Sequence, residues 1–319
     1  MENSFAIVCD VTCDLNAALR AEYGIEYVPG TITFPDGKEE TSFLDWSECK
    51  SIPNCTSEAF YTLLKKDPEA IKSAPANIEV FAEVFEKHIS EGKPVLAISI
   101  SSALSGTYSF MCAAQKMVLE KHPDAKIVVI DSRRYAGGMG LMCIHASMLR
   151  KEGKSFEEVA DYVEKNKNRF HQTGWLDDLF FVAKKGRMTN AKAFFGNLIG
   201  IKPIGELDNS GLTTVIGKAK GEKTAYSVSL KYMEAFGEDL KDQIILVAQS
   251  NRPKQAETYK QMIEEKFSPK AVYICDVFPP TGINVGPGLM VAFYMGKPIS
   301  DDLAEEKAVL ADIIQNTKK

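Results

Sequence analysis

Short apolar runs alternate with segments of helical periodicity over the first half of the chain. The apolar runs have the length of buried strands, and the segments between them place apolar residues three and four positions apart, as one face of a helix does. This alternation predicts an open, mainly parallel sheet with helices packed on it. The expected strands cover residues 6–9, 95–100 and 127–130. One expected helix ends near Tyr23, and three others cover about 77–90, 107–121 and 136–151.

The second half of the chain has a different pattern. Ser155 is expected to cap a helix that reaches about Phe170, and Asp208–Gly211 is a turn sequence between two apolar runs, which predicts a hairpin. We therefore expect an α/β protein with an N-terminal α/β domain over residues 1–155 and a C-terminal α+β domain over residues 156–319, whose sheet is partly antiparallel. The other elements expected there are helices at 190–198, from Glu222, at 253–267 and at 301–316, and strands at 201–204, 212–216, 244–248 and 271–277.

Composition narrows the class of protein. Hydrophobic residues make up 45% and charged residues 25% of the 319 positions, as in globular proteins. The net charge of -5 comes from interspersed acids and bases, so we expect no nucleic-acid partner. The apolar runs are shorter than the ~18 residues of a membrane span. No basic segment precedes an apolar core at the N-terminus, and a cytoplasmic protein is therefore expected.

Metal and cofactor sites are not indicated. The seven cysteines are scattered and form no Cys-x-x-Cys pair, so free and mostly buried thiols are expected. The four histidines fit no metal motif. The chain also lacks the phosphate-loop sequence of nucleotide-binding proteins and the complete glycine fingerprint of dinucleotide-binding proteins. We expect no bound cofactor.

Ser105 and Gly106 lie where the strand at 95–100 ends and the helix at 107–121 begins. The free N–H groups at the start of a helix favour an anion, and a hydroxyl beside them adds a donor. This position predicts a site for a small anionic headgroup. A serine that only caps the helix gives the same local pattern, and the residues alone leave both interpretations open.

Two further segments carry candidate chemistry. Arg187 ends a tight Lys-Gly-Arg turn, where its guanidinium could bind a carboxylate or phosphate or form a salt bridge to Asp177 or Asp178. Residues 284–288, Asn-Val-Gly-Pro-Gly, could cradle a headgroup or serve only as a turn. A serine nucleophile needs a base within reach, and no histidine lies in or beside the predicted loop of Ser105.

Six stretches of the chain, in this order, resemble motifs of the DegV family, which includes the fatty-acid-binding subunits of bacterial fatty acid kinase. The resemblance covers most of the chain and implies a two-domain α/β protein that holds a long-chain fatty acid between its domains. The stretches are Ile7–Leu15, Ser99–Tyr108, Ile130–Ser132, Lys184–Met188, Asn197–Ile204 and Gly286–Gly288.

The resemblance also implies roles for individual residues. Ser105 and the backbone near Gly106 would meet the carboxylate, and Arg187 would lie at the mouth of the site. The family's Thr-Ser-x-Pro motif reads Lys72-Ser73-Ala-Pro here, so either Lys72 or Ser73 would supply a second donor. Asn284 replaces the usual histidine of the closing motif. In the family a separate kinase subunit phosphorylates the bound acid, and the changes at positions 72 and 284 call that step into question.

We therefore expect a lipid-binding protein that is not an enzyme on its own. The acyl chain would enter an apolar tunnel, and Phe194, Phe195, Leu198 and Ile199 would line that tunnel or serve only as core residues. The alternative function is an enzyme, either a hydrolase with Ser105 as its nucleophile or a phosphotransferase-like subunit.

Overall fold

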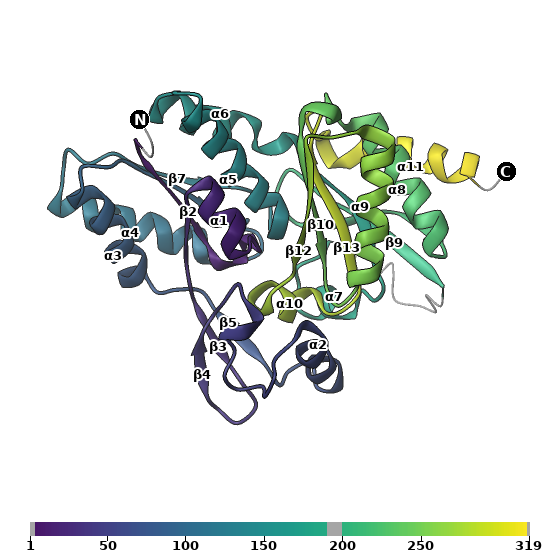
Figure 1. Ribbon diagram of the computed structural model, residues 1–319, viewed down its shortest axis with the longest axis horizontal. Helices are drawn as coiled ribbons and strands as arrows, with labels where there is room; N and C mark the ends of the chain where they lie inside the picture. Colours follow the sequence, from purple (N-terminus) through teal and green to yellow (C-terminus); the bar gives the residue numbers. More distant parts are fainter. Residues whose placement is uncertain (1–3, 190–199, 318–319) are drawn as a thin grey trace.

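The N-terminal half is built around a four-stranded parallel sheet. The computed structural model describes residues 4–189 and 200–317 (Figure 1). The strand order in this sheet, called sheet A, is β2-β1-β6-β7, which confirms the predicted parallel arrangement. Its strands are β1 (Ala6–Asp10), β2 (Ile25–Val28), β6 (Val95–Ser99) and β7 (Ile127–Asp131), and the helices of this half are α1 (Ala17–Tyr23), α2 (Ser57–Lys66), α3 (Ile78–Ser90), α4 (Thr107–Lys121) and α5 (Ala136–Lys151).

A small antiparallel sheet, sheet B, projects from this half. Its strand order is β4-β3-β5, and Figure 1 shows it below sheet A, beside α10 of the C-terminal half. The sequence predicts one of the three, an extended segment at 31–34 that ends in a turn at 35–37, and the other two are too short to produce a pattern. The strands are β3 (Thr31–Thr33), β4 (Glu39–Thr41) and β5 (Lys72–Ala74).

The C-terminal half contains a six-stranded mixed sheet, sheet C, in the order β10-β9-β8-β13-β11-β12. The predicted hairpin is present as β9 and β10, and β11 and β12 run parallel. The strands are β8 (Phe170–Leu176), β9 (Ile201–Leu207), β10 (Thr213–Lys220), β11 (Ile244–Gln249), β12 (Ala271–Asp276) and β13 (Leu289–Met295). The helices are α6 (Phe156–Asn166), α7 (Phe180–Lys184), α8 (Glu222–Phe236), α9 (Pro253–Phe267), α10 (Pro279–Val285) and α11 (Ala304–Thr317).

One predicted helix is too long. Ser155 caps α6 as expected, but α6 ends at Asn166, and Phe170 begins the inner strand β8. All seven residues of β8 are buried, including His171, Gln172 and Thr173. A strand that is buried on both faces shows no alternation of apolar and polar residues. The polar residues inside β8 therefore concealed it.

Helix α5 is a layer shared by the two large sheets. It contacts β1 and β2 of sheet A on one side and β8, β11 and β13 of sheet C on the other. A Cβ atom at Gly137 would lie 2.8 Å from the ring of Phe293 in β13, and one at Gly140 would lie 2.7 Å from the carbonyl oxygen of Cys13. Gly137 thus lets sheet C approach the helix closely, and Gly140 does the same for the turn Val11–Cys13 that follows β1.

The predicted boundary at residue 155 falls between α5 and α6. Sheet A precedes it and sheet C follows it. The division into separate domains at this residue stays a prediction, because α5 packs against both sheets.

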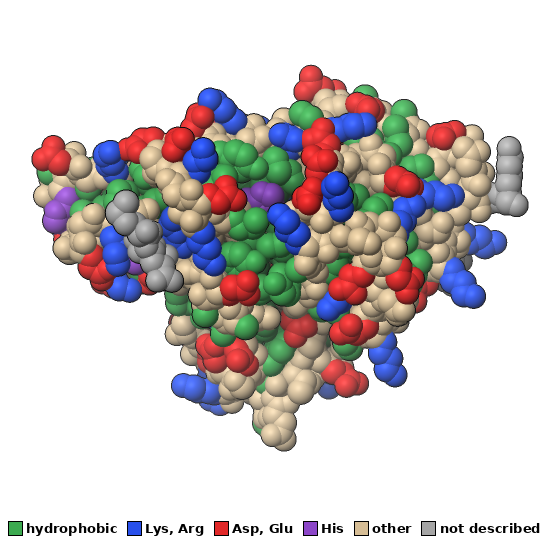
Figure 2. Space-filling model, turned by 45° about the horizontal axis from the view of Figure 1, so that its top comes forward, with side chains coloured by type: hydrophobic (Ala, Val, Ile, Leu, Met, Phe, Trp, Pro, Cys, Tyr) green, Lys and Arg blue, Asp and Glu red, His purple; other side chains and the backbone are tan. Residues whose placement is uncertain are grey.

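The surface carries charges of both signs. Figure 2 shows Lys and Arg side chains interspersed with Asp and Glu, and apolar side chains gathered along the middle of this face. Within residues 4–189 and 200–317, no helix combines the length and hydrophobicity that crossing a membrane requires.

The hairpin tip of β9 and β10 docks on the N-terminal half. The Arg133 guanidinium donates to the carbonyl oxygen of Asn209 at 2.8 Å. Gly211 has a φ of +86°, and a Cβ there would lie 2.1 Å from Ser101 Oγ and 3.0 Å from the Cα of Arg133. Glycine is thus required at this contact for both conformation and space.

We expect Gly211→Ala to reduce the free energy of unfolding by more than Gly37→Ala. Gly37 has a similar φ of +79° with no atom within 4 Å of the added Cβ, so its substitution should cost only the backbone strain, about 1 kcal/mol. The clash at Gly211 adds to that cost. Urea-induced unfolding of both variants measures the difference, and equal losses would show that the tip does not dock tightly.

Candidate functional site

A cavity of about 560 Å³ lies between the two halves of the chain. Its volume is within the range of about 300–1,000 Å³ that is typical of small-molecule sites. The N-terminal half contributes the carboxyl end of β1, the residues that follow β5 and the turn between β6 and α4. The C-terminal half contributes α10, Val182, Arg187 and Thr213. Most of the wall is apolar, with polar side chains from Asp10, Thr12, Ser73, Asn77, Ser105, Thr107, Tyr135, Arg187, Thr213, Thr281 and Asn284.

Ser105 lies in the cavity wall, one residue before Gly106, which is the N-cap of α4. Its Oγ accepts the backbone N–H of Thr107 at 3.3 Å and lies 2.8 Å from Thr107 Oγ1. When Thr107 donates to it, the proton of Ser105 is free for a ligand. The Gly106 N–H also lines this wall and makes no hydrogen bond within the described residues. Ser105 is therefore not the N-cap that one interpretation expected, and the anion-binding interpretation stays a prediction.

Asp10 fixes the shape of this turn. Its Oδ2 accepts the backbone N–H of Ile100 at 2.7 Å, and its Oδ1 accepts the N–H of Thr12 at 2.9 Å. Burial raises the pKa of the Asp10 carboxyl, although these hydrogen bonds partly oppose the shift. Asp10 therefore joins the ends of β1 and β6.

Asp14 is a second buried carboxyl close to the cavity. Its Oδ1 accepts the backbone N–H of Phe278 at 3.0 Å, whereas its Oδ2 makes no hydrogen bond. Burial raises the pKa of Asp14 well above its ordinary value. The Thr281 hydroxyl lies near enough to lower this pKa slightly, but its geometry is not that of a hydrogen bond.

Ser73 lines the cavity, and Lys72 does not. The two residues are adjacent in β5, and successive side chains of a strand point to opposite faces. Ser73 lies opposite Ile32 of β3, which is fully buried, and both Lys72 and Ser73 are exposed. Of the two alternatives, Ser73 is therefore the one that lies in the cavity wall, and the role of either residue as a donor stays a prediction.

Arg187 also lines the cavity. Its Nε donates to the carbonyl oxygen of Leu104 at 3.3 Å, and its Nη1 donates to the carbonyl oxygen of Lys185. The predicted alternative, a salt bridge to Asp177 or Asp178, is wrong because Asp177 pairs with Lys202 and Arg252 and Asp178 accepts the N–H of Phe180. Within the described residues, Arg187 has no carboxylate partner.

Asn284 lies in the cavity wall on α10, a helix that the sequence did not predict. Its Nδ2 donates to the carbonyl oxygen of Pro280, one turn earlier in the helix, at 3.0 Å. The tunnel residues Phe194, Phe195, Leu198 and Ile199 lie outside the described residues.

Sequence reasoning missed Tyr135, Thr213 and Thr281 as wall residues. Each reaches the cavity through a tertiary contact. No signal in the local sequence marks them, because nothing in one segment shows which other segment it will face.

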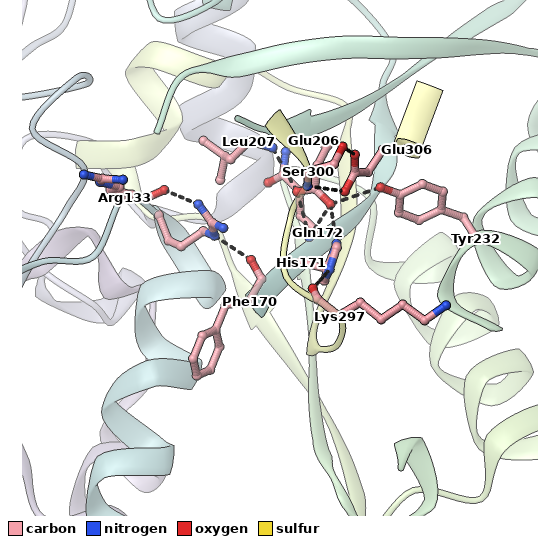
Figure 3. Close-up of polar contacts among 11 residues, drawn as sticks. Arg133, Phe170, His171, Gln172, Glu206, Leu207, Tyr232, Lys297, Ser300 and Glu306 are labelled. Carbon is pink, nitrogen blue, oxygen red and sulfur yellow. Dashed lines mark hydrogen bonds and ion pairs between the residues drawn. The ribbon is translucent and has the colours of Figure 1, made fainter. Parts of the chain in front are cut away.

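Histidine does not occur in the described part of the cavity wall. Figure 3 shows His171 between the carboxyl of Glu206 and the carbonyl oxygen of Lys297, at 2.9 and 2.7 Å. His145 faces the Phe170 ring, and burial lowers its pKa to about 4. Ser105 therefore has no histidine base within the described residues. They also contain no group of three or more side chains suited to a metal ion.

This geometry defines a class of protein. Its members are α/β proteins with an apolar cavity between the sheets and with hydroxyl and guanidinium donors in the cavity wall. The comparison with known families agrees with it. A family model described as "Uncharacterised protein, DegV family COG1307" matches residues 4–297, and this chain belongs to that family.

Relatives of similar length support the assignment. A DegV domain-containing protein of Clostridium perfringens is 31% identical over 92% of this chain and 97% of its own length. One of Clostridium acetobutylicum is 33% identical over 91% of this chain and 98% of its own.

Solved structures share the fold. A Thermus thermophilus DegV family protein described by its fatty acid binding has a TM-score of 0.78 at 24% identity, covering 91% of this chain and 99% of its own. A Ruminococcus gnavus protein described with vaccenic acid has a TM-score of 0.78 at 21% identity, with the same coverage. A stearic-acid-binding protein of Eubacterium ventriosum has a TM-score of 0.76 at 20% identity, covering 91% and 98%.

We expect Asp14→Asn to flatten the pH dependence of stability. A carboxyl whose pKa is raised by folding keeps its proton longer in the native state, so it costs stability as the pH rises from about 4 through its folded pKa. Asparagine removes that proton and can still accept the N–H of Phe278. Urea unfolding from pH 4 to pH 8 should show that the free energy of unfolding of the variant rises relative to that of the wild type as the pH rises.

The control for this experiment is Asp45→Asn at the surface. Hydrogen bonds from Ser47 lower the pKa of Asp45, so its contribution to stability has the opposite sign and is complete just above its ordinary pKa of about 4, and the stability of that variant relative to the wild type should not rise between pH 5 and pH 8. Parallel pH profiles for the wild type and Asp14→Asn would contradict the assignment.

Proposed function

We propose that this protein binds a long-chain fatty acid in the cavity, with the carboxylate at Ser105. The observation that carries the proposal is the composition of the cavity wall: a mostly apolar enclosure with the Ser105 hydroxyl, the Gly106 N–H and the guanidinium of Arg187, which has no carboxylate partner within the described residues. A carboxylate accepts hydrogen bonds and carries the opposite charge to Arg187. Ser73 supplies a further hydroxyl from β5.

The acyl chain contributes most of the binding free energy in this proposal. Each methylene removed from water contributes about 0.8 kcal/mol. The structural relatives described with vaccenic and stearic acid share this fold, which supports a ligand of the same class here.

The protein acts as a carrier rather than as an enzyme in this proposal. A hydrolase would need a base to take the proton of Ser105, and the hydrogen-bonded neighbour of Ser105 is the Thr107 hydroxyl, which is not a base near neutral pH. A cytoplasmic location stays a prediction from the sequence.

Native mass spectrometry of the protein purified from its own host tests the function directly. A co-purifying mass equal to that of a long-chain fatty acid supports the proposal. A protein that is free of lipid, and that takes up none when fatty acid is added, contradicts it.

We expect Ser105→Ala to weaken fatty acid binding by about tenfold or more, because a hydrogen bond to a charged group contributes roughly 1.5–3 kcal/mol. The matched control is Ser109→Ala on the same helix, whose hydroxyl donates to the carbonyl oxygen of Gly106 and does not line the cavity. Titration with a fluorescent fatty acid measures both. Equal affinities of the wild type and a folded Ser105→Ala variant would remove Ser105 from the site.

The finer part of the proposal is that the bound acid is presented to a separate fatty acid kinase. Asn284 bears on this step, because an amide cannot titrate near neutral pH as a histidine does. We expect Asn284→His to raise acyl-phosphate formation by an added kinase of this type, measured per mole of bound acid. Full turnover with the unmodified protein would show that this position does not limit the transfer.

A further inference from the structure

Thr213 and Thr214 are neighbours in β10 whose hydroxyls have different surroundings. Thr214 Oγ1 bonds to Thr189 Oγ1 at 2.6 Å and to Asp208 Oδ2 at 3.4 Å. Thr213 points to the other face of the strand and lines the cavity. It lies opposite Leu207, which belongs to the core shared with the N-terminal half.

The Thr213 hydroxyl has no partner within the described part of the chain. The residue is 7% exposed, and its oxygen is not among the polar atoms that are sealed from solvent. Its methyl group lies over Gly205, 3.6 Å from where a Cβ of that glycine would be. The hydroxyl is a different substituent of the Thr213 Cβ from this methyl group. The hydroxyl is therefore accessible from the cavity, where a ligand oxygen can replace water as its hydrogen-bond partner.

A chain of contacts brings Thr213 to the same end of the cavity as Ser105. The carbonyl oxygen of Thr213 accepts the N–H of Thr189 at 2.9 Å, and Thr213 forms an isolated bridge with Met188. Arg187, the residue before Met188, donates to the carbonyl oxygen of Leu104, the residue before Ser105. Thr213, Arg187 and Ser105 therefore converge from three segments.

We propose that Thr213 is a further ligand-binding residue and that its hydroxyl donates to the polar head of the bound acid. This inference rests on the proposed function. It makes the headgroup a link between the two halves, with Ser105 on one side and Thr213 and Arg187 on the other. The hairpin tip already docks beside this site through Arg133 and Gly211, and the ligand adds a second tie.

The test compares wild type, Thr213→Val, Thr213→Ser and Thr214→Val by titration with a fluorescent long-chain fatty acid and with its methyl ester. Valine keeps the shape of threonine and removes the donor. We expect Thr213→Val to lower the affinity for the acid by about tenfold, and to lower that for the uncharged ester by less, because hydrogen bonds to charged groups are the stronger ones. Thr213→Ser should retain most of the affinity. Thr214→Val should lower the melting temperature and leave the affinity within about twofold, since its hydroxyl bonds only to protein groups.

Hydrogen exchange provides an independent readout. Addition of the acid to the wild type should slow exchange in residues 211–215 as well as around Ser105, and Thr213→Val should lose only the first effect. This measurement on the wild type also decides the question if the valine variant does not fold.

The outcomes separate the two proposals. A wild-type protein that binds neither ligand overturns the proposed function and this inference with it. A wild-type protein that binds the acid, together with a folded Thr213→Val variant of equal affinity, overturns this inference alone. Acid-dependent protection around Ser105 without any in residues 211–215 also overturns it.

Discussion

The packing of α5 between two sheets is the constraint on which the rest of this structure depends. A helix that is buried on both sides needs close approach on both sides, and its glycines provide it at Phe293 and at the carbonyl oxygen of Cys13. Adding side chains there would push away sheet C or the turn Val11–Cys13 that follows β1 of sheet A. Because the cavity lies between the same two halves, its walls depend on the spacing that α5 sets.

The polar groups of the cavity follow from this layering. The carboxyl ends of β1 and β6 face the cavity, where Asp10 joins the two strand ends through the N–H of Ile100. In open α/β sheets, ligands bind at this edge. Sheet C places its own residues opposite, and Arg187 completes the wall by reaching the carbonyl oxygen of Leu104. Neither half alone forms the site.

Local signals in the sequence predicted the elements that local physics determines. The capping residues Asn77 and Ser155 begin α3 and α6, and α4 has the predicted bounds. Prediction failed where long-range burial decides the structure. The strand β8 is hidden by His171 and its polar neighbours, whose partners lie on distant segments: Glu206 accepts from the N–H of Gln172, and the Tyr259 hydroxyl donates to the carbonyl oxygen of Thr173. Similarly, the opposite faces of Lys72 and Ser73 follow from the pairing of β5 with β3, which three residues of sequence do not reveal.

Ser105 shows why the candidate site was only half visible from sequence. Its oxygen lies in the cavity wall and accepts the N–H of Thr107, and its proton is free for a ligand when the Thr107 hydroxyl donates to it. The hydrogen bond to Thr107 joins residues two positions apart, and the sequence reveals that proximity. The proposed binding role depends on Arg187 and on sheet C, more than 80 residues away along the chain, and Arg187 reaches this turn through its hydrogen bond to Leu104. A helix start becomes a ligand site only when a second surface closes over it, and in this chain that surface is held in place by the packing of α5.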